Sequence, residues 1–182
     1  MKVDCVKKFA DKRKATGLRY LPDGGHAEDQ ILSRVKTEAS VSKKRYDEGG
    51  NVTGAVYTKD ESHWSFIADV MRASIVSNPL HLDEFAYVTQ MEAEIIRWTL
   101  DLYRGDANAC GLVTSGGTES ILLAMLAYRE KARAEKGVTK PNMIMSETAH
   151  CAFDKGGFYF GIEIRKVPMT KDFVADLAGM RR

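Results

Sequence analysis

The chain of 182 residues is predicted to have an α/β fold, in which a helical N-terminal part leads into parallel βα units. Apolar residues recur at helical spacing through most of the first half, which is typical of amphipathic helices. From Cys110 onward, short apolar runs alternate with helical patterns that end at Gly137 and Gly161. Strands and helices that alternate in this way indicate a parallel sheet. We therefore expect a helical segment over 1–109 and the start of a larger sheet domain over 110–182.

The first half contains three predicted helices. The first covers 28–45, and an extended connection over 52–58 follows it. The second begins near Ser62 and ends before Pro79, because the residue that precedes a proline is disfavoured in a helix. A loop over 77–83 then leads to a long third helix over 84–104, which we expect to pack between domains or subunits.

The second half is predicted to alternate regularly. The pattern favours a helix over 118–136, a strand over 142–146, a helix over 150–160, a strand over 162–167 and a helix that begins at 171 and is still in progress at Arg182. So few strands would leave an apolar sheet edge without neighbours. We therefore expect an incomplete sheet, and a chain that forms the N-terminal part of a larger protein.

Composition excludes several classes of function. The net charge of +2 gives no electrostatic reason to expect binding to nucleic acid. The three cysteines lack the spacing of a disulfide framework or of a metal site, which fits a cytosol-facing compartment. No apolar run reaches the roughly 18 residues of a membrane span. We expect a cytoplasmic or cytosol-facing chain.

The segment from Val113 to Ser120 is the strongest chemical signal. It contains the turn Ser115-Gly116-Gly117-Thr118, which runs directly into an apolar helix. Adjacent glycines allow several backbone N–H groups to point at one place, and the first N–H groups of a helix have no internal partner. Such a turn suits a phosphate, although it could equally be a simple capped turn.

Three segments occur together in this order: Ser77-Asn78-Pro79-Leu80-His81, Thr114 to Ile121, and Thr148-Ala149-His150-Cys151-Ala152-Phe153. This set resembles the sphingosine-1-phosphate lyases, which are pyridoxal-phosphate (PLP) enzymes of the group II decarboxylase-like type. The resemblance implies a fold-type-I PLP-dependent transferase-like fold and a homodimer. It also implies the cleavage of a phosphorylated sphingoid base into a fatty aldehyde and phosphoethanolamine.

The resemblance also implies roles for particular residues. The backbone at Ser115, Gly116, Gly117 and Thr118 would hold the 5′-phosphate of PLP, and His150 would stack on the cofactor ring. Asn78, His81 and Tyr57 would contact the phosphate or polar head of the substrate, and these three could serve the site of a partner subunit. His150, Tyr57 and His81 are the candidate catalytic residues. No metal ligand is expected, because the cysteines lack the spacing of a metal site. Glu119 is more readily explained as a helix cap than as a catalytic group.

Members of the resembled family link PLP to a lysine in an Asp-x-His-Lys-Tyr-like motif, and that motif is absent from these 182 residues. We therefore expect this chain to be inactive by itself. Eukaryotic members often carry an N-terminal membrane helix, so an endoplasmic-reticulum location would require an anchor outside this chain. Two alternatives remain open, namely part of a PLP-dependent amino-acid decarboxylase, and a non-catalytic dimerisation or binding module.

Overall fold

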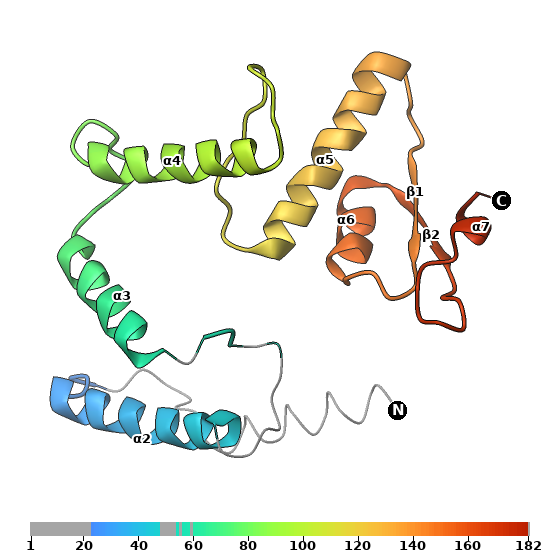
Figure 1. Cartoon of the computed structure of the whole chain (residues 1–182). Coiled ribbons are helices and arrows are strands. Elements are labelled where there is room, and N and C mark those ends of the chain that lie inside the picture. The colour runs from blue at the N-terminus through green and yellow to red at the C-terminus, as the bar shows by residue number, and fades with distance from the viewer. Residues whose placement is uncertain (1–22, 48–53, 55, 59, 182) are drawn as a thin grey trace. The chain divides into compact units, whose positions relative to one another are not determined.

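The computed structural model describes residues 23–47, 54, 56–58 and 60–181 (Figure 1). The chain divides into two compact units, Met1–Ser74 and Ile75–Arg182. The domain boundary that the sequence suggested, after residue 109, remains a prediction.

The described part of the first unit contains two helices, α2 (Glu28–Asp47) and α3 (Glu61–Ser74). Asp60 precedes α3 and accepts hydrogen bonds from the N–H groups of Ser62 and His63, at 2.9 and 3.2 Å. An ion pair of 2.8 Å between Lys43 and Glu61 joins the two helices. Both predicted helices are confirmed. The predicted extended connection over 52–58 lies partly outside the described residues.

The second unit begins with the predicted loop and the long helix α4 (Ala86–Leu102). The Asn78 side chain accepts a hydrogen bond from the Leu80 N–H at 3.2 Å, and its carbonyl oxygen accepts one from the His81 N–H at 3.0 Å. These bonds form a turn of the kind that Asn favours. The loop and the helix are confirmed, with the helix shorter by two residues at each end than predicted.

Two helices and two strands form the compact part of this unit: α5 (Gly117–Lys136), β1 (Asn142–Ser146), α6 (Ala152–Phe160) and β2 (Glu163–Val167). The strands pair in parallel from Asn142–Glu163 to Ser146–Val167. Gly137 and Gly161 end α5 and α6 in the left-handed conformation, with φ of 64° and 63°, as helix-stopping glycines do. The predicted alternation is confirmed.

The buried residues of the described chain lie in these elements. Met125 on α5, Met145 on β1, Ala152 on α6 and Ile162 before β2 are the hydrophobic side chains removed from solvent. Helix α5 packs on α6, and α6 packs on β2. The core is therefore a small layer of two helices on two strands.

The end of the chain differs from the prediction. The helix expected from 171 to 182 begins only at Leu177 and ends at Met180 (α7). A turn precedes it, because the Thr170 N–H donates to the Val174 carbonyl at 2.9 Å and Met169 pairs with Ala175 as an isolated bridge. Phe173 in this turn has a positive φ of 60°, which a helix cannot contain.

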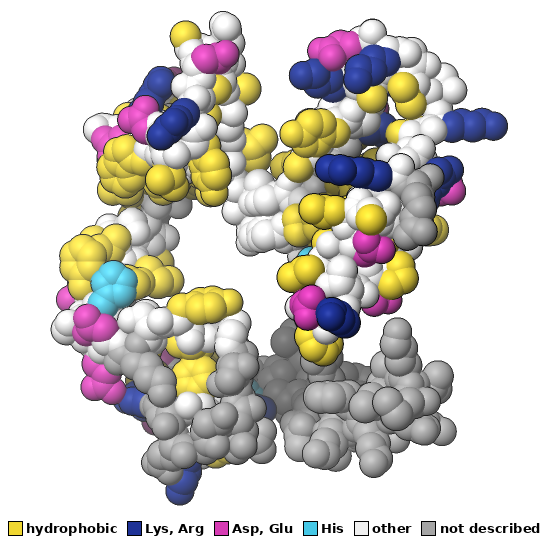
Figure 2. Space-filling model, turned by 45° about the vertical axis from the view of Figure 1, so that its right-hand side comes forward, with side chains coloured by type: hydrophobic (Ala, Val, Ile, Leu, Met, Phe, Trp, Pro, Cys, Tyr) yellow, Lys and Arg dark blue, Asp and Glu magenta, His cyan; other side chains and the backbone are white. Residues whose placement is uncertain are grey.

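Large hydrophobic side chains are exposed along α3 and α4 (Figure 2). On α4 they include Tyr87, Met91, Ile95, Trp98 and Leu102, which share the helical spacing seen in the sequence. The expectation that α4 packs between domains or subunits remains a prediction. Among the described residues, no helix combines the length and the apolar character needed to cross a bilayer.

Candidate cofactor site

The glycine pair of the phosphate-like turn stands at the start of α5. Gly116 is the N-cap residue, and its φ of 155° and ψ of 174° suit a residue without a side chain. A Cβ atom added at Gly116 or Gly117 would have no neighbour within 4 Å. The backbone here is therefore open to close approach by a ligand.

The first turn of α5 presents unused hydrogen-bond donors. The N–H groups of Gly117, Thr118 and Glu119 have no partner among the described residues, whereas the Ser120 N–H already donates to the Gly116 carbonyl at 3.1 Å. The dipole of a 20-residue helix places partial positive charge at the same end. These groups suit an anion with several oxygen atoms, such as a phosphate.

Two further hydrogen bonds cross the glycine pair. The Ser115 N–H donates to Glu119 Oε2 at 2.6 Å, and the hydroxyl groups of Thr114 and Ser120 lie 2.6 Å apart. Hydrogen bonding by Ser115, through its side chain and then its backbone N–H, lowers the pKa of the Glu119 carboxyl from its ordinary value. Glu119 thus ties the residue before the N-cap to the first turn of α5.

His150 lies between the end of β1 and the start of α6. Its Nδ1 accepts a hydrogen bond of 3.1 Å from the N–H of Ala152, the first residue of α6. An accepting Nδ1 carries no proton, so in the neutral ring the proton is on Nε2. The imidazole is exposed, which leaves its face accessible to a ligand.

The topology brings the glycine turn and His150 to the same edge of the fold. Helix α5 begins at the end of the layer at which β1 finishes and α6 begins (Figure 1). Met125 lies against Gly156, and Arg129, further along α5, donates to the Phe160 carbonyl at the end of α6 at 3.0 Å. The two helices therefore run in the same direction, and their N-terminal ends share this edge. The carboxyl edge of parallel strands is where α/β proteins place their ligands.

The other three predicted site residues belong to segments outside α5, α6 and the two strands. Asn78 and His81 form one turn of the second unit, and the His81 side chain has no hydrogen-bond partner among the described residues. Tyr57 belongs to the first unit, is 90% exposed, and donates its hydroxyl to the Gly54 carbonyl at 2.7 Å. Their roles in binding or catalysis remain predictions.

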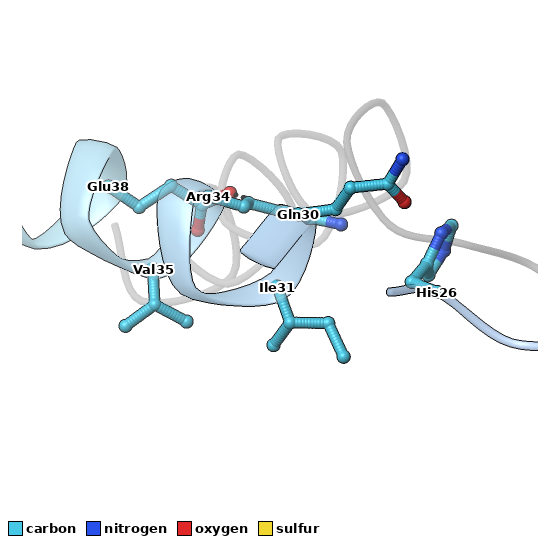
Figure 3. A pocket seen from close by; sticks show the side chains of 6 residues that line it. All are labelled: His26, Gln30, Ile31, Arg34, Val35 and Glu38. Carbon is cyan, nitrogen blue, oxygen red and sulfur yellow. Dashed lines mark hydrogen bonds and ion pairs between the residues drawn. The ribbon is translucent and has the colours of Figure 1, made fainter. Parts of the chain in front are cut away.

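Two pockets are lined by residues other than those of the glycine turn. One, of about 240 Å³, is lined along α2 by His26, Gln30, Ile31, Arg34, Val35 and Glu38, with Ile31 and Val35 pointing to the same side (Figure 3). The other, of about 400 Å³, lies where α5 and α6 end and is lined by Arg129, Arg133, Val138, Thr139, Pro141, Phe160 and Gly161. Neither contains a predicted site residue.

Sequence analysis missed the contacts that hold the site residues. The hydroxyl pair of Thr114 and Ser120 was not predicted, although two hydroxyl residues flanking a glycine pair are a visible signal. The bond from Ala152 to His150 was also missed, because Ala152 contributes only its backbone N–H.

A glycine-rich turn at a helix start and an imidazole at the carboxyl edge of parallel strands define an α/β protein with a candidate site for a phosphorylated ligand. Residues 29–181 match the pyridoxal-dependent decarboxylase conserved domain, and the chain belongs to this family of pyridoxal-dependent enzymes. The predicted family and fold class are confirmed, and the cofactor of this family is PLP.

Relatives with curated descriptions are sphingosine-1-phosphate lyases. The Drosophila melanogaster lyase is 39% identical over 175 residues, which cover 94% of this chain and 32% of the relative. Sphingosine-1-phosphate lyase 1 of Mus musculus is 39% identical over 165 residues, covering 91% of this chain and 28% of the relative. The chain therefore spans about a third of the length of these relatives.

Solved structures agree with the fold. A sphingosine-1-phosphate lyase of Burkholderia pseudomallei superposes with a TM-score of 0.76 at 34% identity, covering 90% of this chain and 39% of that structure. A glutamate decarboxylase of Lactobacillus brevis superposes with a TM-score of 0.57 at 20% identity, covering 89% of this chain and 38% of that structure. The second likeness concerns the fold alone.

Proposed function

We propose that this chain is the phosphate-binding part of a PLP-dependent lyase that acts on phosphorylated sphingoid bases. The observation that carries the proposal is the start of α5, where the N–H groups of Gly117, Thr118 and Glu119 find no partner among the described residues and the glycine pair is open to approach. The same turn lies inside the region shared with the lyases at 39% identity.

In this proposal Ser115, Gly116, Gly117 and Thr118 form the turn that holds the 5′-phosphate, and the N–H groups at the start of α5 donate to its oxygens. A helix start supplies such donors without the cost of removing them from other partners. The chemistry that PLP supplies when bound is the withdrawal of electrons from the bond that is cut.

His150 is proposed to cover one face of the cofactor ring. The bond from the Ala152 N–H to Nδ1 holds the imidazole in a fixed orientation, which is the condition for stacking. The same bond leaves Nε2 as the ring's free proton donor. His150 can therefore both orient the ring and donate a hydrogen bond from Nε2.

Asn78, His81 and Tyr57 are proposed to bind the phosphate or polar head of the substrate. Their exposed side chains and the turn at Asn78 fit a role at the rim of a site. A homodimer, in which these residues serve the partner's site, is part of the proposal. The exposed apolar faces of α3 and α4 are consistent with burial in such an assembly.

The proposal is tested by assaying the protein encoded by the whole reading frame that contains this chain. Release of a fatty aldehyde and phosphoethanolamine from sphinganine 1-phosphate, in the presence of PLP, would support the lyase. Release of carbon dioxide from an amino acid without aldehyde would favour the decarboxylase alternative.

The remaining alternative, a non-catalytic dimerisation or binding module, predicts a different experimental result. A whole protein that forms dimers and binds PLP, yet converts neither substrate, would favour it. We expect the 182-residue chain alone to show no lyase activity, because the cofactor-linking lysine motif is absent from its sequence.

A further inference from the structure

Two short hydrogen bonds tie the chain before the glycine pair to the first turn of α5. The Ser115 N–H binds the Glu119 carboxylate at 2.6 Å, and the Thr114 and Ser120 hydroxyls lie 2.6 Å apart. Both bonds start before Gly116 and end after Gly117, so together they span the flexible part of the turn. We call these two bonds the glycine brace.

A glycine pair needs such support if it is to hold an anion. Glycine loses more conformational freedom than other residues when its backbone becomes ordered. Tertiary packing by the described residues does not hold Gly116 and Gly117, because apart from their chain neighbours and the α5 backbone no atom lies within 4 Å of their Cβ positions. A ligand that had to order the turn itself would bind more weakly than one that met a turn already in place.

We propose that Glu119 is a positioning residue, which holds the turn in its phosphate-binding shape through the Ser115 N–H and does not itself touch the cofactor. The inference rests on the proposed function, in which the turn binds the phosphate of PLP. This role would explain why a carboxylate, which repels another anion, stands beside a proposed phosphate site.

The opposite role is that Glu119 competes with the phosphate. Its carboxylate is itself an anion, and it occupies one N–H of the turn. The free donors argue against competition, because no described residue pairs with the N–H groups of Gly117, Thr118 and Glu119 while the brace is formed. A phosphate can use these donors without displacing the carboxylate from Ser115.

The test compares Glu119→Ala and Glu119→Gln in the 182-residue chain, with Glu135→Ala as the matched control. Glu135 is an exposed carboxylate near the other end of α5, 3.9 Å from Lys131. The probe is pyridoxine 5′-phosphate, which has no aldehyde and so forms no imine with surface lysines, and pyridoxine without phosphate is the reference ligand. Binding is measured by isothermal titration calorimetry.

We expect Glu119→Ala to weaken binding of pyridoxine 5′-phosphate by roughly two- to ten-fold, the ratio for one lost hydrogen bond. Glu119→Gln keeps an acceptor for the Ser115 N–H and should bind as tightly as the unmodified chain or more tightly. Tighter binding by Glu119→Ala would show competition and overturn the proposal. Equal binding by the unmodified chain and Glu119→Ala would also overturn it.

A measurement without ligand keeps the two proposals separable. Amide hydrogen exchange, followed by NMR, should be faster at Ser115 and Gly116 in Glu119→Ala than in the unmodified chain, with no change in Glu135→Ala. Unchanged exchange at Ser115 would overturn the brace whatever the ligand does. Faster exchange, combined with no binding of the probe to any variant, would support the brace and count against the proposed function alone.

Discussion

The N–H of Ala152 donates a hydrogen bond of 3.1 Å to Nδ1 of His150, so the residue proposed to stack on the cofactor also caps the helix that follows it. Ala152 is buried, with 2% of its surface exposed. Its N–H is therefore poorly placed to find water as a substitute partner. The orientation of His150 and the start of α6 therefore depend on each other.

This shared bond allows stability and binding to be separated. His150→Phe keeps an aromatic ring but leaves the Ala152 N–H unpaired, which should reduce the free energy of unfolding by about 1–3 kcal/mol. His150→Asn supplies a short acceptor that is favoured at helix starts, so its stability should change less. Thermal unfolding measures both.

The affinity for pyridoxine 5′-phosphate should rank the two variants in the opposite order to their stability. His150→Asn loses the flat ring and should bind pyridoxine 5′-phosphate more weakly than His150→Phe. If the two variants bound equally, the stacking role of His150 would be wrong, whatever their stabilities.

Gly157 is predicted to tolerate no side chain. A Cβ atom there would lie 2.5 Å from Ile164 Cγ1 and 2.9 Å from the Ile162 carbonyl oxygen. The Ile162 oxygen belongs to the backbone, which cannot move aside as easily as a side chain. Gly157→Ala should lower the free energy of unfolding by about 1–3 kcal/mol. Chemical denaturation followed by circular dichroism checks this.

Gly117→Ala is the matched control for Gly157→Ala. No atom lies within 4 Å of its Cβ position, and alanine favours a helix more than glycine does. The control should leave stability unchanged or raise it by up to about 1 kcal/mol. A loss as large as that of Gly157→Ala would mean that crowding is not the cause.

Met125 is predicted to be the most costly methionine to remove. It is 2% exposed and lies against Gly156 of α6, so Met125→Ala should cost about 2–5 kcal/mol through lost burial and a cavity. Met91→Ala on α4, where the side chain is 53% exposed, should cost about 0.5 kcal/mol or less. Equal losses would contradict the described core.

The pH dependence of the glycine brace follows from Glu119. Its pKa is lowered by hydrogen bonding with Ser115, so its carboxylate form is favoured in the folded chain. The stabilisation is complete above the ordinary carboxyl pKa and is lost as the pH falls through the lowered value. The effect on stability is small, because the group is exposed to solvent.

The Ser115 amide is the direct reporter of this titration. Its NMR shift should change with a midpoint below the ordinary glutamate value of 4.5. In Glu119→Gln the same shift should show no such step. A midpoint at or above the ordinary value would contradict the bond between Ser115 and Glu119.

Local patterns in the sequence were sufficient to predict the main elements. The periodicity of α2, α3, α4 and α5 and the stops at Gly137 and Gly161 depend on residues close together in the chain. The glycine turn is local for the same reason, since Gly116 and Gly117 act through their own backbone. Short-range steric rules determine these features, so they can be read without the fold.

Tertiary contacts decided what the local pattern could not. The Met169 N–H donates to Glu147 Oε1 at 3.1 Å, from a residue 22 positions earlier, which helps hold the turn that delays α7 until Leu177. The start of α6 brings the buried Ala152 N–H to His150, and the packing of Met125 against Gly156 keeps α5 close to α6. Such contacts depend on the path of the backbone, which the identities of neighbouring residues do not determine.

The sequence by itself determined which residues could form a phosphate turn, and the tertiary structure decided that the turn and His150 share one edge of the sheet.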